Sequence, residues 1–185
     1  IEIGAGAELA VTGRLDQTLT LNSGQTLKGE GTLRGGLIAG SGAVVAPGSS
    51  PGVLTVTGNV TLQSGSTFEV ELLGTLSGEY DQLVMSSGAT FTAGGATLSV
   101  VAPSPLTLGF VFPVISGWSS IDSSTFAGLP DGAAITAGAN VLQINYGTKP
   151  GYANDVTLTV IPEPASLTLL ALAAGAAAAL RRRMR

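Results

Sequence analysis

The sequence predicts an all-β fold, a solenoid-like domain over residues 1–160, followed by one C-terminal transmembrane α-helix. Three observations support this prediction. Short segments of alternating apolar and polar residues run through the body of the chain, separated by glycine-rich turns. One strand-turn-strand pattern recurs along the chain. Residues 161–185 differ, because they contain an uncharged run that ends in arginines.

The composition suits many short strands joined by turns. The 185 residues include 27 glycines and 9 prolines, and only 11% are charged. There is no cysteine and no histidine, so disulfides and thiolate metal sites are excluded. Residues 1–160 carry four basic and eleven acidic side chains, which argues against nucleic-acid binding. The sequence opens on Ile1, and we expect any secretory signal to lie upstream.

The recurring pattern reads apolar-x-apolar-x-Ser-Gly-x-Thr-apolar. It occurs at residues 19–27, 60–68 and 83–91, with a partial copy from Ser41. The Ser-Gly pairs begin at residues 23, 41, 64 and 87, so their spacings are 18, 23 and 23. Glycine accepts the positive φ that a tight corner needs. One such unit cannot bury its apolar face alone, whereas stacked units can, so the pattern predicts a solenoid with Ser-Gly corners.

Other segments fit the same plan. A rigid double turn is expected at residues 47–52, and residues 116–140 are less regular, with Trp118 and Phe126 as local apolar anchors. The last expected strand leads directly into Pro162. By their alternation or apolar runs, further strands are expected at residues 53–62, 67–73, 96–101, 109–115, 140–146 and 155–161.

The segment that begins GSGAVVAPGSSPGVLTVTGNV at Gly40 resembles the autotransporter-associated β-strand repeats of large bacterial surface proteins. The resemblance covers roughly residues 19–160. It implies a right-handed parallel β-helix and display at the cell surface, and it implies no catalytic residues.

Candidate catalytic or metal-binding residues are few. Glu69 and Glu71 stand two apart on an expected strand, so their carboxylates share one face about 7 Å apart. This is near the separation of an inverting glycosidase pair. The alternative is a solvated strand face, with Phe68, Val70 and Leu72 turned inward. The sequence implies no cofactor, and we expect no enzymatic activity.

Two weaker ligand patterns are present. Glu79 and Asp81 could contact calcium, but two carboxylates fall short of the six or more oxygens that this ion takes, so a solvated turn is the alternative. Asn59 opens a glycosylation sequon, a triplet that also arises by chance. A glycan-binding module would need exposed aromatic side chains, and the candidates are Tyr80, Trp118, Tyr146 and Tyr152.

The C-terminal segment combines three features. Pro162, Glu163 and Pro164 form a rigid tripeptide, and Pro164 suits a helix start. Residues 165–180 carry no charge and have no polar face. Sixteen residues of helix span roughly 24 Å, and flanking residues can bridge part of the gap to a hydrocarbon core of about 30 Å. An alanine-rich core helix of a soluble protein is the alternative, but it would need partner helices, and the sequence offers none.

The chain closes on a basic cluster of Arg181, Arg182, Arg183 and Arg185. Basic flanks stay in the cytoplasm, so residues before Pro162 are expected on the outside. This order of tripeptide, apolar helix and arginines resembles the PEP-CTERM sorting signal. The resemblance implies that an exosortase, an integral-membrane enzyme, cuts near the tripeptide and releases or transfers the protein to the cell surface.

We therefore expect an exported, non-enzymatic structural or adhesive protein of the bacterial cell surface or extracellular matrix. Its expected partners are an exosortase, the lipid bilayer through residues 165–180, and an extracellular polysaccharide; nucleic acid is not expected. The alternative is a carbohydrate-active or glycan-binding β-helix protein.

Overall fold

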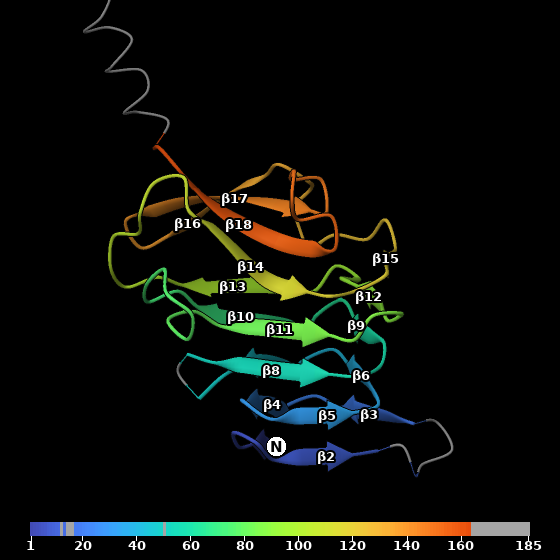
Figure 1. Ribbon diagram of the computed structural model, residues 1–185. Helices are drawn as coiled ribbons and strands as arrows, with labels where there is room; N and C mark the ends of the chain where they lie inside the picture. Colours follow the sequence, from blue (N-terminus) through green and yellow to red (C-terminus); the bar gives the residue numbers. More distant parts are fainter. Residues whose placement is uncertain (12, 14–16, 50, 164–185) are drawn as a thin grey trace, which may run out of the picture.

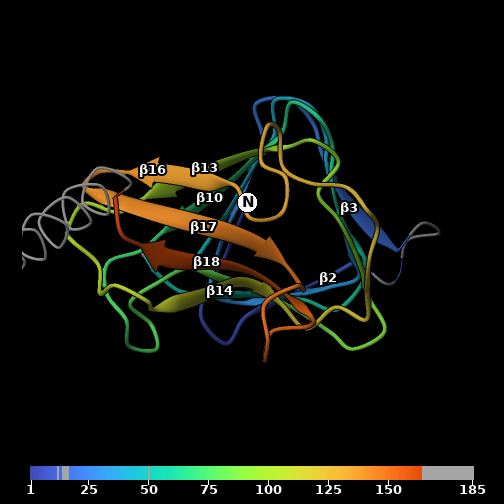
Figure 2. The ribbon, with the colours of Figure 1, turned by 90° about the horizontal axis from the view of Figure 1, so that it is seen from above.

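A computed structural model describes residues 1–11, 13, 17–49 and 51–163. Within these residues the chain forms eighteen strands and no helix, which confirms the all-β prediction for this part. The strands form three sheets. In Figure 1 the strands of each sheet lie one above another along a common axis. Seen along that axis in Figure 2, the sheets form the sides of a prism around a common core.

Sheet A consists of five parallel strands, β1 (Glu2–Ile3), β4 (Thr26–Gly29), β7 (Val44–Pro47), β10 (Thr67–Glu71) and β13 (Thr97–Val101). Sheet C consists of five parallel strands, β3 (Thr18–Leu21), β6 (Gly36–Ala39), β9 (Val60–Leu62), β12 (Thr90–Thr92) and β15 (Ser120–Ile121). The parallel part of sheet B consists of β2 (Glu8–Ala10), β5 (Thr32–Arg34), β8 (Val53–Val56), β11 (Gln82–Met85) and β14 (Val111–Ser116).

The chain visits the three sheets in the order A, B, C and then starts again, which makes a coil of five turns. Equivalent residues of successive turns lie directly above one another. In sheet A, Leu27 pairs with Val45, which pairs with Phe68, and all three are fully buried. In sheet C, Leu37, Val60 and Phe91 form a similar buried column. These columns supply the core that a single turn cannot make. The hand of the coil remains a prediction.

The Ser-Gly corners connect sheet C to sheet A at three of the four predicted positions. Gly24 donates its N–H to the carbonyl of Gly42 at 2.9 Å, and Gly42 donates to Gly65 at 2.8 Å. All three have positive φ, between 76° and 83°. The corners therefore stack as the repeat predicts, each bonding to the next through its backbone.

The fourth Ser-Gly pair does not form a corner between sheets C and A, so the prediction is wrong at this position. Ser87 and Gly88 lie in the turn between β11 and β12, which joins sheet B to sheet C. The stacked C-to-A corner continues instead at Gly94 and Gly95, between β12 and β13. The physical reason is the long connection between β10 and β11, residues 72–81, which lengthens the fourth turn. A constant spacing of 23 residues between corners therefore leads to the turn between sheets B and C instead of the corner between sheets C and A.

The parallel stacking ends with β15, and an antiparallel cap follows. Strand β14 pairs with β18 (Asp155–Ile161), β18 with β17 (Asn140–Tyr146), and β17 with β16 (Ala134–Ala137), all antiparallel. The sequence pattern predicts two of these strands with their observed bounds but does not reveal their direction, because alternation is the same in parallel and antiparallel strands.

Aromatic side chains fill the space between coil and cap. Trp118 is 2% exposed and stacks on Phe91, with ring centroids 5.5 Å apart, and Phe126 is 1% exposed against Phe68 and Tyr146. The Tyr146 hydroxyl accepts the N–H of Phe126 at 3.0 Å and donates to the carbonyl of Leu129 at 2.8 Å. The prediction that Trp118 and Phe126 are local anchors is confirmed.

Candidate functional site

The junction between the cap and the C-terminal segment is the first candidate site. Strand β18 lies between β14 and β17, and its last residue, Ile161, pairs with Val141. Pro162 and Glu163 follow at once and are exposed. Proline has no N–H to continue the ladder, which explains why the strand ends there. The predicted tripeptide therefore starts with no linker between it and a central strand; Pro164 lies outside the described residues.

The loop of residues 102–110 is hydrogen-bonded to the strands at this junction. The buried side chain of Asn140 accepts the N–H of Leu106 at 2.7 Å and donates to the carbonyl of Ser104 at 2.9 Å. Gly109 donates to the carbonyl of Val160 at 2.9 Å, and Val160 donates to Phe110 at 3.0 Å. The loop of residues 102–110 is thus fixed to β17 through Asn140 in its first half and to the end of β18 through Val160 in its second half.

A shallow cavity of about 320 Å³ lies between this loop and the junction. Leu108 is 65% exposed at its edge, and among the described residues of its lining Glu163 alone is charged. The other lining residues are apolar or uncharged: Pro105, Leu106, Ala139, Asn140, Val141, Val160, Ile161 and Pro162.

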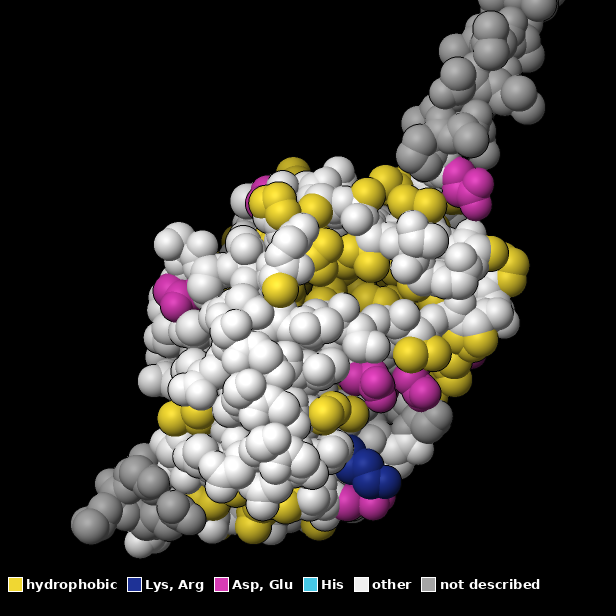
Figure 3. All heavy atoms as spheres, turned by 180° about the vertical axis from the view of Figure 1, so that it is seen from behind, with side chains coloured by type: hydrophobic (Ala, Val, Ile, Leu, Met, Phe, Trp, Pro, Cys, Tyr) yellow, Lys and Arg dark blue, Asp and Glu magenta, His cyan; other side chains and the backbone are white. Residues whose placement is uncertain are grey.

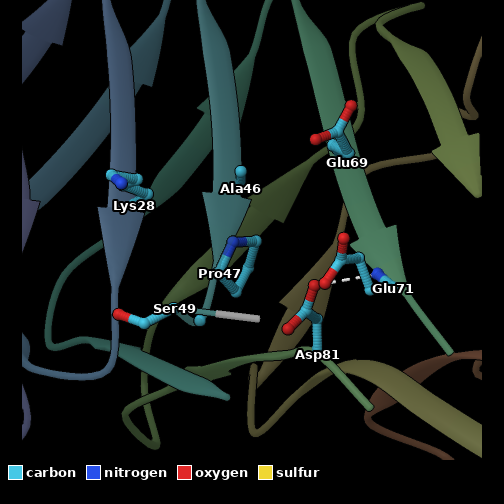
Figure 4. A pocket seen from close by; sticks show the side chains of 8 residues that line it. Lys28, Ala46, Pro47, Ser49, Glu69, Glu71 and Asp81 are labelled. Atoms are coloured by element: carbon cyan, nitrogen blue, oxygen red, sulfur yellow. Dashed lines mark hydrogen bonds between the residues drawn. The ribbon is translucent and has the colours of Figure 1, made fainter. Parts of the chain in front are cut away.

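The second candidate site is a cleft of about 180 Å³ on the outer face of sheet A, shown in Figure 4. Glu69 and Glu71 reach it from β10, Lys28 from β4, and Asp81 from the residue before β11. Phe68, Val70 and Leu72 point the other way and are fully buried. The predicted division of β10 into an outer acidic face and an inner apolar face is therefore confirmed. Figure 3 shows this side of the molecule, where acidic side chains gather near a basic one and an apolar hollow lies beneath the cap.

Asp81 is the least exposed carboxylate of the cleft, at 3%. Its Oδ1 accepts the N–H of Gly52 and its Oδ2 that of Glu71, both at 2.8 Å, so it joins three segments of the chain. Burial raises the pKa of Asp81 to about 6; the two N–H bonds oppose this, and the charges of Glu71 and Glu69 add to it. The sequence carries a signal for this role, because Asp81 falls in the inward register of Leu83 and Met85.

The cleft offers limited chemistry. Both Asp81 oxygens already accept backbone N–H groups, and Lys28 forms an ion pair with Glu2 at 3.1 Å. Glu79, the other half of the predicted calcium pair, is turned to its own loop, where it accepts the N–H of Leu76 at 3.0 Å. Glu79 and Asp81 thus bind different backbone groups. Among the residues that the structure describes, no group of three acidic side chains is arranged to hold a metal ion.

The aromatic candidates for glycan binding divide into two pairs. Trp118 and Tyr146 are buried in the cap, so they lack the exposure that a glycan-binding module would need. Tyr80 and Tyr152 are half-buried, and Tyr80 packs edge-on against Phe112 with centroids 5.2 Å apart. These aromatic side chains pack inside the domain because the cap covers the end of the coil. The sequence pattern does not reveal this cap. Asn59 is exposed, and its side-chain oxygen accepts the N–H of Thr90 at 2.9 Å.

Comparison with known families bears on the junction. A family model of the PEP-CTERM protein-sorting motif matches residues 160–183. No curated protein and no solved structure matches the chain. The sorting motif predicted at the C-terminus is therefore confirmed.

The predicted membrane helix, residues 165–180, and the four arginines lie outside the described residues. Within residues 1–11, 13, 17–49 and 51–163, no helix is long and apolar enough to cross a bilayer. The motif itself indicates an exported, membrane-associated protein that is sorted through exosortase processing.

Proposed function

We propose that the chain is a structural or adhesive protein of the cell surface or extracellular matrix, whose β-coil is the cargo of its C-terminal sorting signal. The observation that best supports this is the position of the tripeptide. Ile161 ends the central strand of the cap, and Pro162 and Glu163 are exposed immediately beyond it. A cut at or after the tripeptide would separate the signal from the cargo without removing any residue that the sheets use.

In this proposal residues 165–180 span the membrane before processing. Arg181, Arg182, Arg183 and Arg185 remain on the cytoplasmic side, and the β-coil stands outside. Exosortase then cuts near Pro162, Glu163 and Pro164 and transfers or releases the folded domain.

The cargo is proposed to be non-enzymatic and related to autotransporter-associated β-strand repeats. The stacked parallel turns with glycine corners are in keeping with such repeats. Asp81, whose pKa burial raises to about 6, has both oxygens engaged by backbone N–H groups, so it is poorly placed to transfer protons to a substrate.

A carbohydrate-active function is the second candidate, and the cleft that holds Glu69 and Glu71 on one face favours it. The test is cleavage of a panel of polysaccharides by the chain and by Glu71→Gln. Cleavage that disappears in the variant while its fold is retained would establish the enzyme. A panel left uncut, with binding to immobilised polysaccharide retained, would support an adhesive role.

The sorting mechanism is tested by deleting the tripeptide, residues 162–164, in a host that contains the exosortase. We expect the deleted form to stay in the membrane fraction uncut, whereas the intact chain matures. A deletion variant that matures to the same surface form as the parent would contradict the mechanism.

A further inference from the structure

We propose that the cap docks on the bilayer surface through the face around Pro162, with Leu108 inserted into the interfacial layer of lipid headgroups. We name this face the junction face and define it by Pro105, Leu106, Leu108, Ala139 and Ile161. The inference deepens the proposed function, because it rests on residues 165–180 spanning the membrane.

The first argument is the length of the connection. Ile161 is still paired to Val141, and the apolar run begins at Ala165. Four residue steps cover at most about 14 Å when fully extended. Each headgroup layer is about 5–8 Å thick, given the difference between a whole bilayer and its hydrocarbon core. The end of β18 is therefore held inside the headgroup layer or within about 9 Å of it.

The second argument is the chemistry of the junction face. Residues 102–110 and 137–142 contain no charged residue, although the domain as a whole is acidic. Leu108 exposes 65% of its surface there, and Pro105 and Ala139 are also exposed. An uncharged face with an exposed leucine gains free energy by entering the apolar edge of a bilayer, whereas the single Glu163 can remain among the headgroups.

The third argument is rigidity. Asn140 binds two backbone groups of the loop, and the loop bonds to both the N–H and the carbonyl of Val160. Leu108 is consequently presented from a loop that is fixed to the strand entering the membrane segment. Figure 1 shows this loop, between β13 and β14, rising beside the point where the chain leaves β18, and Figure 2 shows them on the same side.

The experiment uses the full chain in vesicles of zwitterionic phospholipid without exosortase. Because the chain has no cysteine, Leu108→Cys creates a single thiol for an environment-sensitive fluorophore. Ser23→Cys is the matched control, since Ser23 is also exposed and lies at the corner between β3 and β4, at the opposite end of the coil. Both positions are on the surface, so neither label should disturb the core.

We expect both labelled chains to float with the vesicles. The label at 108 should shift its emission to the blue and lose its sensitivity to a water-soluble quencher, and headgroup-linked quenchers should reach it. The label at 23 should keep its aqueous emission. If the chains float but both labels remain aqueous, docking is overturned while membrane anchoring stands. If the chains do not float, the anchoring itself fails. Protection of residue 108 only after exosortase is added would assign the junction face to the enzyme and overturn docking on lipid.

Discussion

Ile161 pairs with Val141 in the ladder between β17 and β18, and the sorting tripeptide starts at the next residue. The folded cargo and its signal therefore share a border without a spacer. Within the described residues, each of the sheets is complete at residue 161. This border has a direct consequence for truncated forms.

A chain that ends at Glu163 should fold and unfold cooperatively, because it retains all of the strands described here. A chain that ends at Asn154 should not, because it lacks β18, the strand that joins β14 to β17. Circular dichroism during urea titration of both chains measures this. Equal unfolding transitions for the two chains would show that β18 is dispensable.

Tyr146 should be the most sensitive tyrosine of the cap. Tyr146→Phe leaves the buried N–H of Phe126 and the carbonyl of Leu129 without their partner, which should cost about 1–3 kcal/mol of unfolding free energy. Tyr152→Phe is the control, since Tyr152 is half-buried at the rim, and it should be nearly neutral. Losses of similar size in the two variants would refute the role given to the Tyr146 hydroxyl.

Substitution of Thr157 should stabilise the domain, in contrast to Tyr146→Phe. It is fully buried on β18, and its hydroxyl has no hydrogen-bond partner within the described structure. Thr157→Val keeps the shape and removes the unpaired group, so we expect a gain of about 1 kcal/mol in the free energy of unfolding. Thr136→Val, at an exposed position of β16, should change little. Destabilisation by Thr157→Val would mean that this hydroxyl is satisfied in solution.

The corner at Gly94 and Gly95 tests the corrected repeat. Both residues have positive φ, but a Cβ on Gly94 would overlap the carbonyl oxygen of Leu62 in the preceding turn, whereas one on Gly95 meets only ordinary contacts. Gly95→Ala should cost about 1–2 kcal/mol, the penalty for a left-handed backbone. Gly94→Ala should cost clearly more, because the stacked backbones must separate. Equal costs would place the stacked corner elsewhere.

Asp81 should make stability depend on pH in a defined window. Its pKa is about 6 when folded against a usual 3.8, so between these values the folded state binds more protons than the unfolded state. The contribution of Asp81 is thus greatest below about pH 4 and is lost as pH rises to about 6, about 3 kcal/mol in all. Asp81→Asn should abolish this part of the pH dependence.

Urea titrations of parent and variant at several pH values, on the chain ending at Glu163, give the comparison. The difference between the two curves isolates Asp81 from the other acidic groups, among them Asp155, whose pKa burial also raises. A difference that is flat from pH 4 to pH 6 would mean that Asp81 titrates normally in the folded domain.

Several features of the fold could be predicted from the sequence because they depend on local patterns. The alternation in β10 assigned Phe68 inward and Glu69 outward, and glycine marked three of the stacked corners. The fourth corner could not be predicted by counting, because the loop of residues 72–81 changes the length of one turn without changing the stacking. The antiparallel direction of β17 and β18 depends on long-range pairing, which alternation does not encode.

The two candidate sites also differ in how far they could be predicted from the sequence. Pro162 and Glu163 could be identified from sequence because a sorting signal is read as a linear motif. The role of Asp81 could not, because its partners Gly52 and Glu71 come from two other segments that only the coil brings together. The burial of Tyr146 likewise depends on the cap.

Intact-mass analysis of the surface fraction, from hosts with and without the exosortase, tests the central claim most directly. We predict a surface form that ends at or shortly after Pro162, retains the whole of β18, and appears only when the enzyme is present. A full-length, membrane-bound chain in both hosts, or a mature form cut within residues 155–161, would contradict the account.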